Sequence, residues 1–185
     1  MPEIARAILE PWSAFYAMTG ASAASLTGLM FVVITLVTGE RMRKNPDGIS
    51  TFSTPTVLHF SMALLASAIL SAPWRTLGGP AILLAITGLF GVGYVVRVMH
   101  KTRHLQVYSP DLEDWTWYTV LPLVAYGAIT SGAGMFFRLP AQAPFAFAGG
   151  VALLILIGIH NAWDVVTYIA VGDPDDPPNS NSNSS

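Results

Sequence analysis

Long apolar runs, separated by charged residues, prolines and glycines, dominate the chain. A bilayer core of about 30 Å requires roughly 17 to 25 apolar residues in each helix that crosses it. Five runs have this length, at residues 14–38, 55–74, 80–99, 117–137 and 145–171. The pattern therefore predicts an all-α fold, a polytopic bundle of five transmembrane helices.

Prolines indicate where these helices begin and end. Pro73 and Pro80 flank a short segment between the second and third runs, so we expect a tight hairpin there. Pro122, in the fourth run, should cause a mild kink at most. Residues 1–172 then form a single transmembrane domain. The acidic, Asn/Ser-rich residues 173–185 have nothing to bury and should form a disordered tail.

Composition supports a membrane protein and excludes other classes. Apolar residues make up 52% of the chain and charged residues only 11%, against roughly 25% charged in soluble domains. The net charge of −2 provides no basic surface for nucleic acid. The chain has no cysteine, which excludes disulfides and thiolate-bound metals. We expect no cofactor and no metal site, and the bilayer is the expected partner.

The distribution of basic residues predicts the orientation of the bundle. Six basic residues lie after the first run or at the end of the third: Arg41, Arg43, Lys44, Arg97, Lys101 and Arg103. Three, Arg6, Arg75 and Arg138, lie on the opposite side. Because cytoplasmic loops carry an excess of Lys and Arg, the N-terminus should be outside and the C-terminus cytoplasmic.

Two stripes of small residues are candidate helix-packing surfaces. The first run carries Gly20, Ala24 and Gly28, and the fourth carries Gly127, Ser131 and Gly134. Helices in lipid associate through close contact at small residues. We expect these stripes to pack against each other or against copies in a second subunit, with an ordinary helix contact inside the monomer as the alternative. A homo-oligomer or a larger membrane complex is therefore left open.

The last run carries the most informative polar residues. When each residue is placed 100° further around the helix axis, five of these polar residues share an arc of about 120° on one face of the helix. They are His160, Asn161, Asp164, Thr167 and Tyr168. This arc must face protein or water, because a carboxylate in hydrocarbon costs several kcal/mol.

Two residues of other runs should lie at a similar depth. Arg97 lies two residues before the end of the third run, and His59 lies four residues after Pro55, in the second. We predict an ion pair between Arg97 and Asp164, with His59, His160 and Asn161 around it.

These polar residues are compatible with three different functions. As structural ties between helices, these residues favour an accessory or assembly component of the membrane. As a site open to the cytoplasm, in which His160 and Asp164 pass a proton, they favour a proton- or ion-conducting bundle. An intramembrane enzyme is third. Ser131 and His160 invite comparison with intramembrane serine proteases, but Ile129 replaces the first glycine of that motif and the two depths differ by about 13 Å.

The N-terminal half carries a recognisable pattern. Trp12-x-x-Phe15-Tyr16 is followed by Leu26-Thr27-Gly28-Leu29-x-Phe31-Val32, and then by Pro55 with His59-Phe60. Over roughly the first 75 residues the chain resembles a group of small polytopic bacterial inner-membrane proteins whose activity is uncharacterised. The resemblance implies a bacterial inner (plasma) membrane location and an uncleaved first span. It implies no activity and no site residue.

Overall fold

The computed structural model describes residues 2–38, 46–103 and 115–171. Within these ranges every regular element is helical and no strand occurs, which confirms the all-α prediction. The elements are α1 (Pro2–Leu9), η1 (Glu10–Trp12), α2 (Ser13–Thr38), α3 (Pro46–Ser71), α4 (Gly78–Arg103), η2 (Thr116–Val120), α6 (Leu121–Met135) and α7 (Ala143–Val171).

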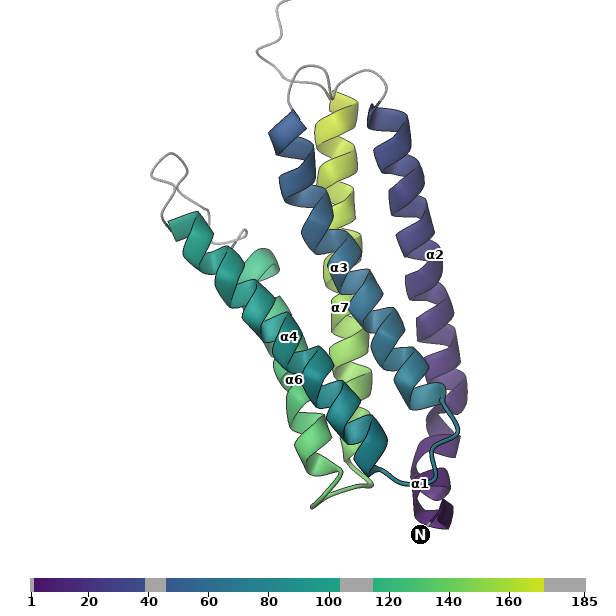
Figure 1. The fold of residues 1–185 in the computed structure, drawn as a ribbon. Coiled ribbons are helices and arrows are strands. Elements are labelled where there is room, and N and C mark those ends of the chain that lie inside the picture. The colour runs from purple at the N-terminus through teal and green to yellow at the C-terminus, as the bar shows by residue number, and fades with distance from the viewer. Residues whose placement is uncertain (1, 39–45, 104–114, 172–185) are drawn as a thin grey trace, which may run out of the picture.

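The long helices run alternately up and down the bundle (Figure 1). α3 ends at Ser71 and α4 begins at Gly78, so the predicted hairpin is present. This hairpin and the α6–α7 connection lie at the same end as α1 (Figure 1). The segments that carry Arg6, Arg75 and Arg138 therefore share one end, while Arg97 lies toward the other. Residues 41, 43 and 44 and the tail 173–185 lie outside the described residues.

Among the described residues, four helical stretches are long and apolar enough to cross a membrane: Glu3–Thr35, Thr54–Ser71, Gly78–His100 and Ala143–Asp164. The first, with 33 residues, is longer than one crossing of a hydrocarbon core of about 30 Å needs. α6 has only 15 residues. With η2, however, the helical stretch Thr116–Met135 extends about 30 Å.

η2 is a π-helical turn, and Pro122 explains its position. Proline has no N–H to donate, and its ring collides with the carbonyl group four residues earlier, which here belongs to Tyr118. The backbone avoids this conflict by widening the preceding turn, so that the N–H of Leu121 donates to the carbonyl of Thr116. The expected mild kink is instead a widened turn, and it changes the directions in which Trp117 and Tyr118 project.

The helices pack in a spatial order that differs from their order in the chain. α2 packs against α3, α3 against α7, α7 against α6, and α6 against α4. The core between them is almost wholly apolar, with fully buried residues that include Tyr16, Phe60, Leu84, Tyr126, Ile129, Phe147, Leu154 and Ile157.

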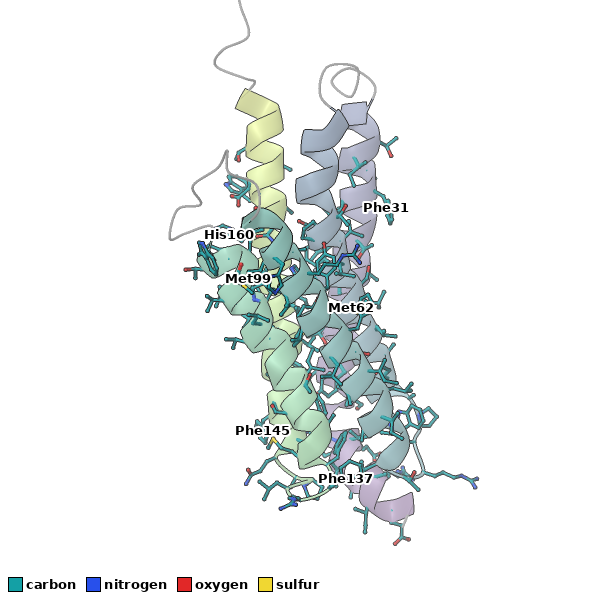
Figure 2. All side chains as sticks on the ribbon, turned by 60° about the vertical axis from the view of Figure 1, so that its left-hand side comes forward. Phe31, Met62, Met99, Phe137, Phe145 and His160 are labelled. Carbon is teal, nitrogen blue, oxygen red and sulfur yellow. The ribbon has the colours of Figure 1, made fainter. Side chains whose placement is uncertain are left out.

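The outward faces of the bundle are apolar as well. Phe31 and Phe145, labelled in Figure 2, are 58% and 67% exposed. Ile86, Phe90 and Trp163 are exposed in the same way. A helix that is apolar on all sides is typical of a membrane span, because lipid covers the face that protein leaves open.

Glycines lie where the helices approach most closely. A Cβ at Gly88 of α4 would lie 2.9 Å from the backbone nitrogen of Thr130 in α6. A Cβ at Gly150 of α7 would lie 2.8 Å from the carbonyl oxygen of Ala125. Backbone atoms cannot move aside as side chains do, so these two glycines fix the α4–α6 and α6–α7 spacing.

The predicted small-residue stripes contribute less to contacts within the chain. Gly20 meets Ser67 of α3, with 3.2 Å between a Cβ at Gly20 and the Cβ of Ser67. Ala24 is exposed, and Gly28, Gly127 and Gly134 have nothing within 4 Å of the position of a Cβ. Because α2 packs on α3 and α6 packs on α4 and α7, the two stripes do not meet within one chain. The interface with a second subunit stays a prediction.

Candidate functional site

Four residues of η2 and α7 form one group, which we call the Asp164 cluster: Trp117, Tyr118, His160 and Asp164. The rings of Trp117 and His160 are stacked, with centroids 3.7 Å apart and planes 9° from parallel. The hydroxyl of Tyr118 donates to Oδ2 of Asp164 at 3.3 Å. The π-helical turn thus brings two successive aromatic residues of η2 onto two residues of α7 that lie one turn apart.

Within the cluster, His160 and Asp164 form the closest pair of titratable groups. Nδ1 of His160 lies 3.4 Å from Oδ2 of Asp164, and the two side chains are 26% and 43% exposed. At this distance a protonated imidazole and the carboxylate attract each other as ions, but the contact is not a hydrogen bond. Both side chains are partly exposed, whereas the Nδ1 atom of His160 is itself buried.

A second polar contact lies deeper in the bundle. Nδ1 of His59 in α3 and the hydroxyl of Tyr126 in α6 are joined by a buried hydrogen bond of 2.9 Å. His59 is 2% exposed and Tyr126 is fully buried. The ring of Tyr126 also fills the space that a side chain at Gly91 of α4 would need. Tyr126 therefore connects three helices, and no polar pattern in the sequence singled it out.

Two more hydrogen bonds tie helices together near the opposite end. The hydroxyl of Tyr16 in α2 donates to the carbonyl oxygen of Pro144 in α7 at 2.8 Å. The hydroxyls of Thr19 in α2 and Ser67 in α3 lie 3.1 Å apart. Both contacts are buried, so each satisfies polar groups that neither lipid nor the apolar core could satisfy.

Asn161 differs from these residues. It is fully buried, yet neither its amide nitrogen nor its amide oxygen has a hydrogen-bond partner among the described residues. An unpaired buried amide typically costs about 1–3 kcal/mol. Asn161 therefore lowers the stability of the described structure, because no hydrogen bond offsets the cost of burying its amide.

We expect Asn161→Leu to raise the free energy of unfolding by about 1–3 kcal/mol, because it replaces an unpaired amide with an apolar group of similar branching. Thermal unfolding in detergent would measure the change, with Asn161→Ala as the control that leaves a cavity. A less stable Asn161→Leu protein would mean that the amide has a partner in the assembled molecule.

The predicted ion pair between Arg97 and Asp164 is absent from the ion pairs of the described residues, so this prediction is wrong. Arg97 is exposed on α4, and α4 packs on α6 while Asp164 belongs to α7. Asp164 instead accepts a hydrogen bond from Tyr118. α6 packs against both α4 and α7. Equal depth in the bundle is therefore not enough to bring Arg97 and Asp164 into contact.

The remaining predicted residues of α7 play local roles or lie outside the description. The hydroxyl of Thr167 donates to carbonyl oxygens of its own helix, at Trp163 and Asp164, each at 3.0 Å. The side chain of Tyr168 lies outside the described residues. The structure thus brings His160 and Asp164 together, and His59 and Asn161 are buried separately from that pair.

The geometry of Ser131 agrees with the argument against a serine nucleophile. Its hydroxyl donates to the carbonyl of Ala128 in its own helix at 3.0 Å. The adjacent Gly132 faces Phe147, which precedes His160 by about 20 Å along α7. In the described part of the chain, no three His, Asp or Glu side chains gather closely enough to hold a metal ion.

The described residues thus form an all-helical fold with four membrane-length apolar helices and with buried polar contacts between helices. No protein family, curated protein or solved structure matches the chain. Its function must therefore be argued from its own geometry.

Proposed function

We propose that the chain is a five-span integral membrane protein of the bacterial inner membrane that acts as an accessory or assembly component. Its N-terminus lies outside and its C-terminus in the cytoplasm. The Thr116–Met135 stretch forms the fifth span, and the small-residue stripes of α2 and α6 meet copies of the chain or other subunits. Its polar residues are ties that fix the arrangement of the helices.

One observation carries this proposal. Four side-chain hydrogen bonds each join two different helices of the bundle. They are Tyr16 to Pro144, Thr19 to Ser67, His59 to Tyr126, and Tyr118 to Asp164. They bind α2 to α7, α2 to α3, α3 to α6, and η2 to α7. In lipid, where apolar burial does not drive association, such bonds and close packing determine which helices meet.

The layer between these ties favours a structural role over conduction. Phe60, Leu154 and Ile157 are fully buried and apolar, and Gly158 packs directly against the ring of Phe60. A proton or ion crossing the bundle needs a sequence of polar groups or water. The described core instead offers separate polar pairs with close-packed hydrocarbon between them.

A proton- or small-ion-conducting bundle is the second candidate, and the His160–Asp164 pair favours it. The two groups lie 3.4 Å apart and are partly exposed. They also lie beside a π-helical turn, a feature that is frequent at functional sites. In an oligomer, copies of this pair could line a shared entry for protons.

Asp164→Asn separates the two candidates, because asparagine still accepts the hydrogen bond from Tyr118 but cannot carry a proton. If the residues are ties, the variant should accumulate and melt within about 1 kcal/mol of the wild type, as is usual for partly exposed pairs. Neither protein should then pass protons into pyranine-loaded proteoliposomes faster than lipid alone does.

The opposite result is equally clear. Proton flux in wild-type vesicles that disappears in folded Asp164→Asn protein contradicts the accessory role and supports conduction. Tyr118→Phe serves as the matched control, because it removes the hydrogen bond that Asp164→Asn retains and leaves the carboxylate in place.

A further inference from the structure

A groove opens at the end of the bundle that carries α1. It has a volume of about 430 Å³ and lies between the α1–η1 segment and the end of α3 with the turn that follows it. Arg6 and Glu10 line one wall, and Trp74 and Arg75 line the other. We propose that this groove binds the phosphate headgroup of an anionic phospholipid, an inference that rests on the membrane location proposed above.

The charge of the groove suits a phosphate. Two guanidinium groups and one carboxylate line it, which leaves a net charge of +1. Arg75 takes part in none of the ion pairs among the described residues, and its side chain is exposed. Arginine presents a fork of N–H donors that matches phosphate oxygens.

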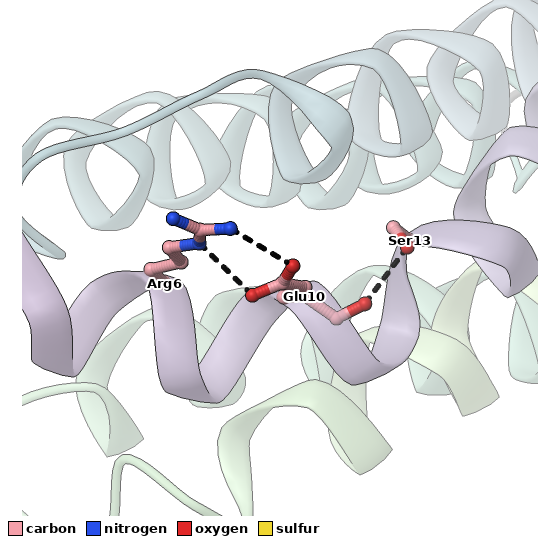
Figure 3. Close-up of polar contacts among 3 residues, drawn as sticks. All are labelled: Arg6, Glu10 and Ser13. Carbon is pink, nitrogen blue, oxygen red and sulfur yellow. Dashed lines mark hydrogen bonds and ion pairs between the residues drawn. The ribbon is translucent and has the colours of Figure 1, made fainter.

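Glu10 orients Arg6 and leaves most of its donors available (Figure 3). Nε and Nη2 of Arg6 donate to the two carboxylate oxygens at 3.0 and 3.3 Å. This hydrogen bond lowers the pKa of the Glu10 carboxyl, so the carboxylate stays charged near neutral pH. A guanidinium has five N–H donors. Three of them are therefore left for a ligand held in the groove.

The rest of the groove suits the lipid part of the ligand. Leu9 and Leu70 form an apolar base, 6% and 1% exposed. The indole N–H of Trp74 donates to the carbonyl of Ile69 at 2.6 Å, which fixes the ring as a wall. Tryptophan concentrates at the headgroup level of bilayers. A free phosphate ion would use the arginines alone, whereas a phospholipid would also contact the partly exposed indole of Trp74.

The depth of the groove agrees with a headgroup site. α1 extends beyond the portion of the first helical stretch that hydrocarbon can hold. Trp12 of η1 packs edge-on against Phe145 of α7, with ring centroids 4.6 Å apart, so a pair of aromatic residues also lies at this end of the bundle. An arginine pair at this level faces headgroups and not acyl chains.

Native mass spectrometry of the full chain in detergent, titrated with dioleoyl-phosphatidylglycerol, tests the proposal. The wild type should retain at least one such lipid and bind it at least tenfold more tightly than dioleoyl-phosphatidylcholine. The Arg6→Gln, Arg75→Gln double variant should lose this preference. Arg138→Gln is the matched control, because Arg138 is exposed at the same end but does not line the groove.

Each of the other outcomes contradicts a specific step of the proposal. Equal loss in Arg138→Gln would mean that general surface charge attracts the lipid. Competition by sn-glycerol 3-phosphate at equal concentration would mean that the ligand is a soluble phosphate. A chain that enters the membrane fraction but shows no lipid preference contradicts this inference alone, whereas a chain that stays out of the membrane contradicts the proposed function as well.

Discussion

Gly88→Ala is expected to lower the free energy of unfolding by about 1–3 kcal/mol, the usual cost of forcing an extra carbon into a close-packed contact. The new Cβ would lie 2.9 Å from the backbone nitrogen of Thr130 and 3.0 Å from the carbonyl oxygen of Tyr126. Because both atoms belong to the backbone of α6, α4 and α6 must separate along their contact. Thermal unfolding in detergent, followed by size-exclusion chromatography, measures the loss.

Gly93→Ala provides the matched control on the same helix. A Cβ at Gly93 has nothing within 4 Å, and alanine is a better helix former than glycine by about 1 kcal/mol. This variant should therefore be as stable as the wild type or more so. If both variants melt alike, the close α4–α6 contact at Gly88 is not present in the folded protein.

The sequence predicted the helices well because the signals for a membrane helix are local. The length of an apolar run and the positions of Pro73 and Pro80 are enough to place a span and a hairpin. Which glycine lies in a helix crossing is not local information, because it depends on the rotation of two helices about their axes. Gly28 and Gly127 fit the small-residue pattern as well as Gly88 and Gly150 do, yet only the latter two meet a neighbouring backbone.

The Asp164 cluster, too, was predicted only where the signal in the sequence is local. His160 and Asp164 are four residues apart on one helix, so their proximity follows from helical geometry alone. The contact of Tyr118 with Asp164 was not predicted, since nothing in the sequence indicated that Pro122 would widen the turn before it. Arg97 was placed beside Asp164 by depth, but depth does not determine which helices are neighbours.

Tyr126→Phe is expected to destabilise the protein by about 1–3 kcal/mol, although it removes a single oxygen atom. The loss leaves Nδ1 of His59 without its partner, at a residue that is only 2% exposed. A buried polar atom that loses its partner costs its full desolvation penalty, whereas removing both partners costs much less. A double-mutant cycle with His59→Leu, measured by thermal unfolding in detergent, separates these two contributions.

In that cycle the double variant should be more stable than the sum of the two single losses predicts, by between about 0.6 and 1.7 kcal/mol, the average and the maximum found for hydrogen bonds between membrane helices. Tyr94→Phe serves as the control for removing a tyrosine hydroxyl from the bundle, because Tyr94 is only partly buried. If the two losses add to within about 0.5 kcal/mol, His59 and Tyr126 do not act as a pair. The proposal that such bonds determine which helices meet would then lose one of its buried examples.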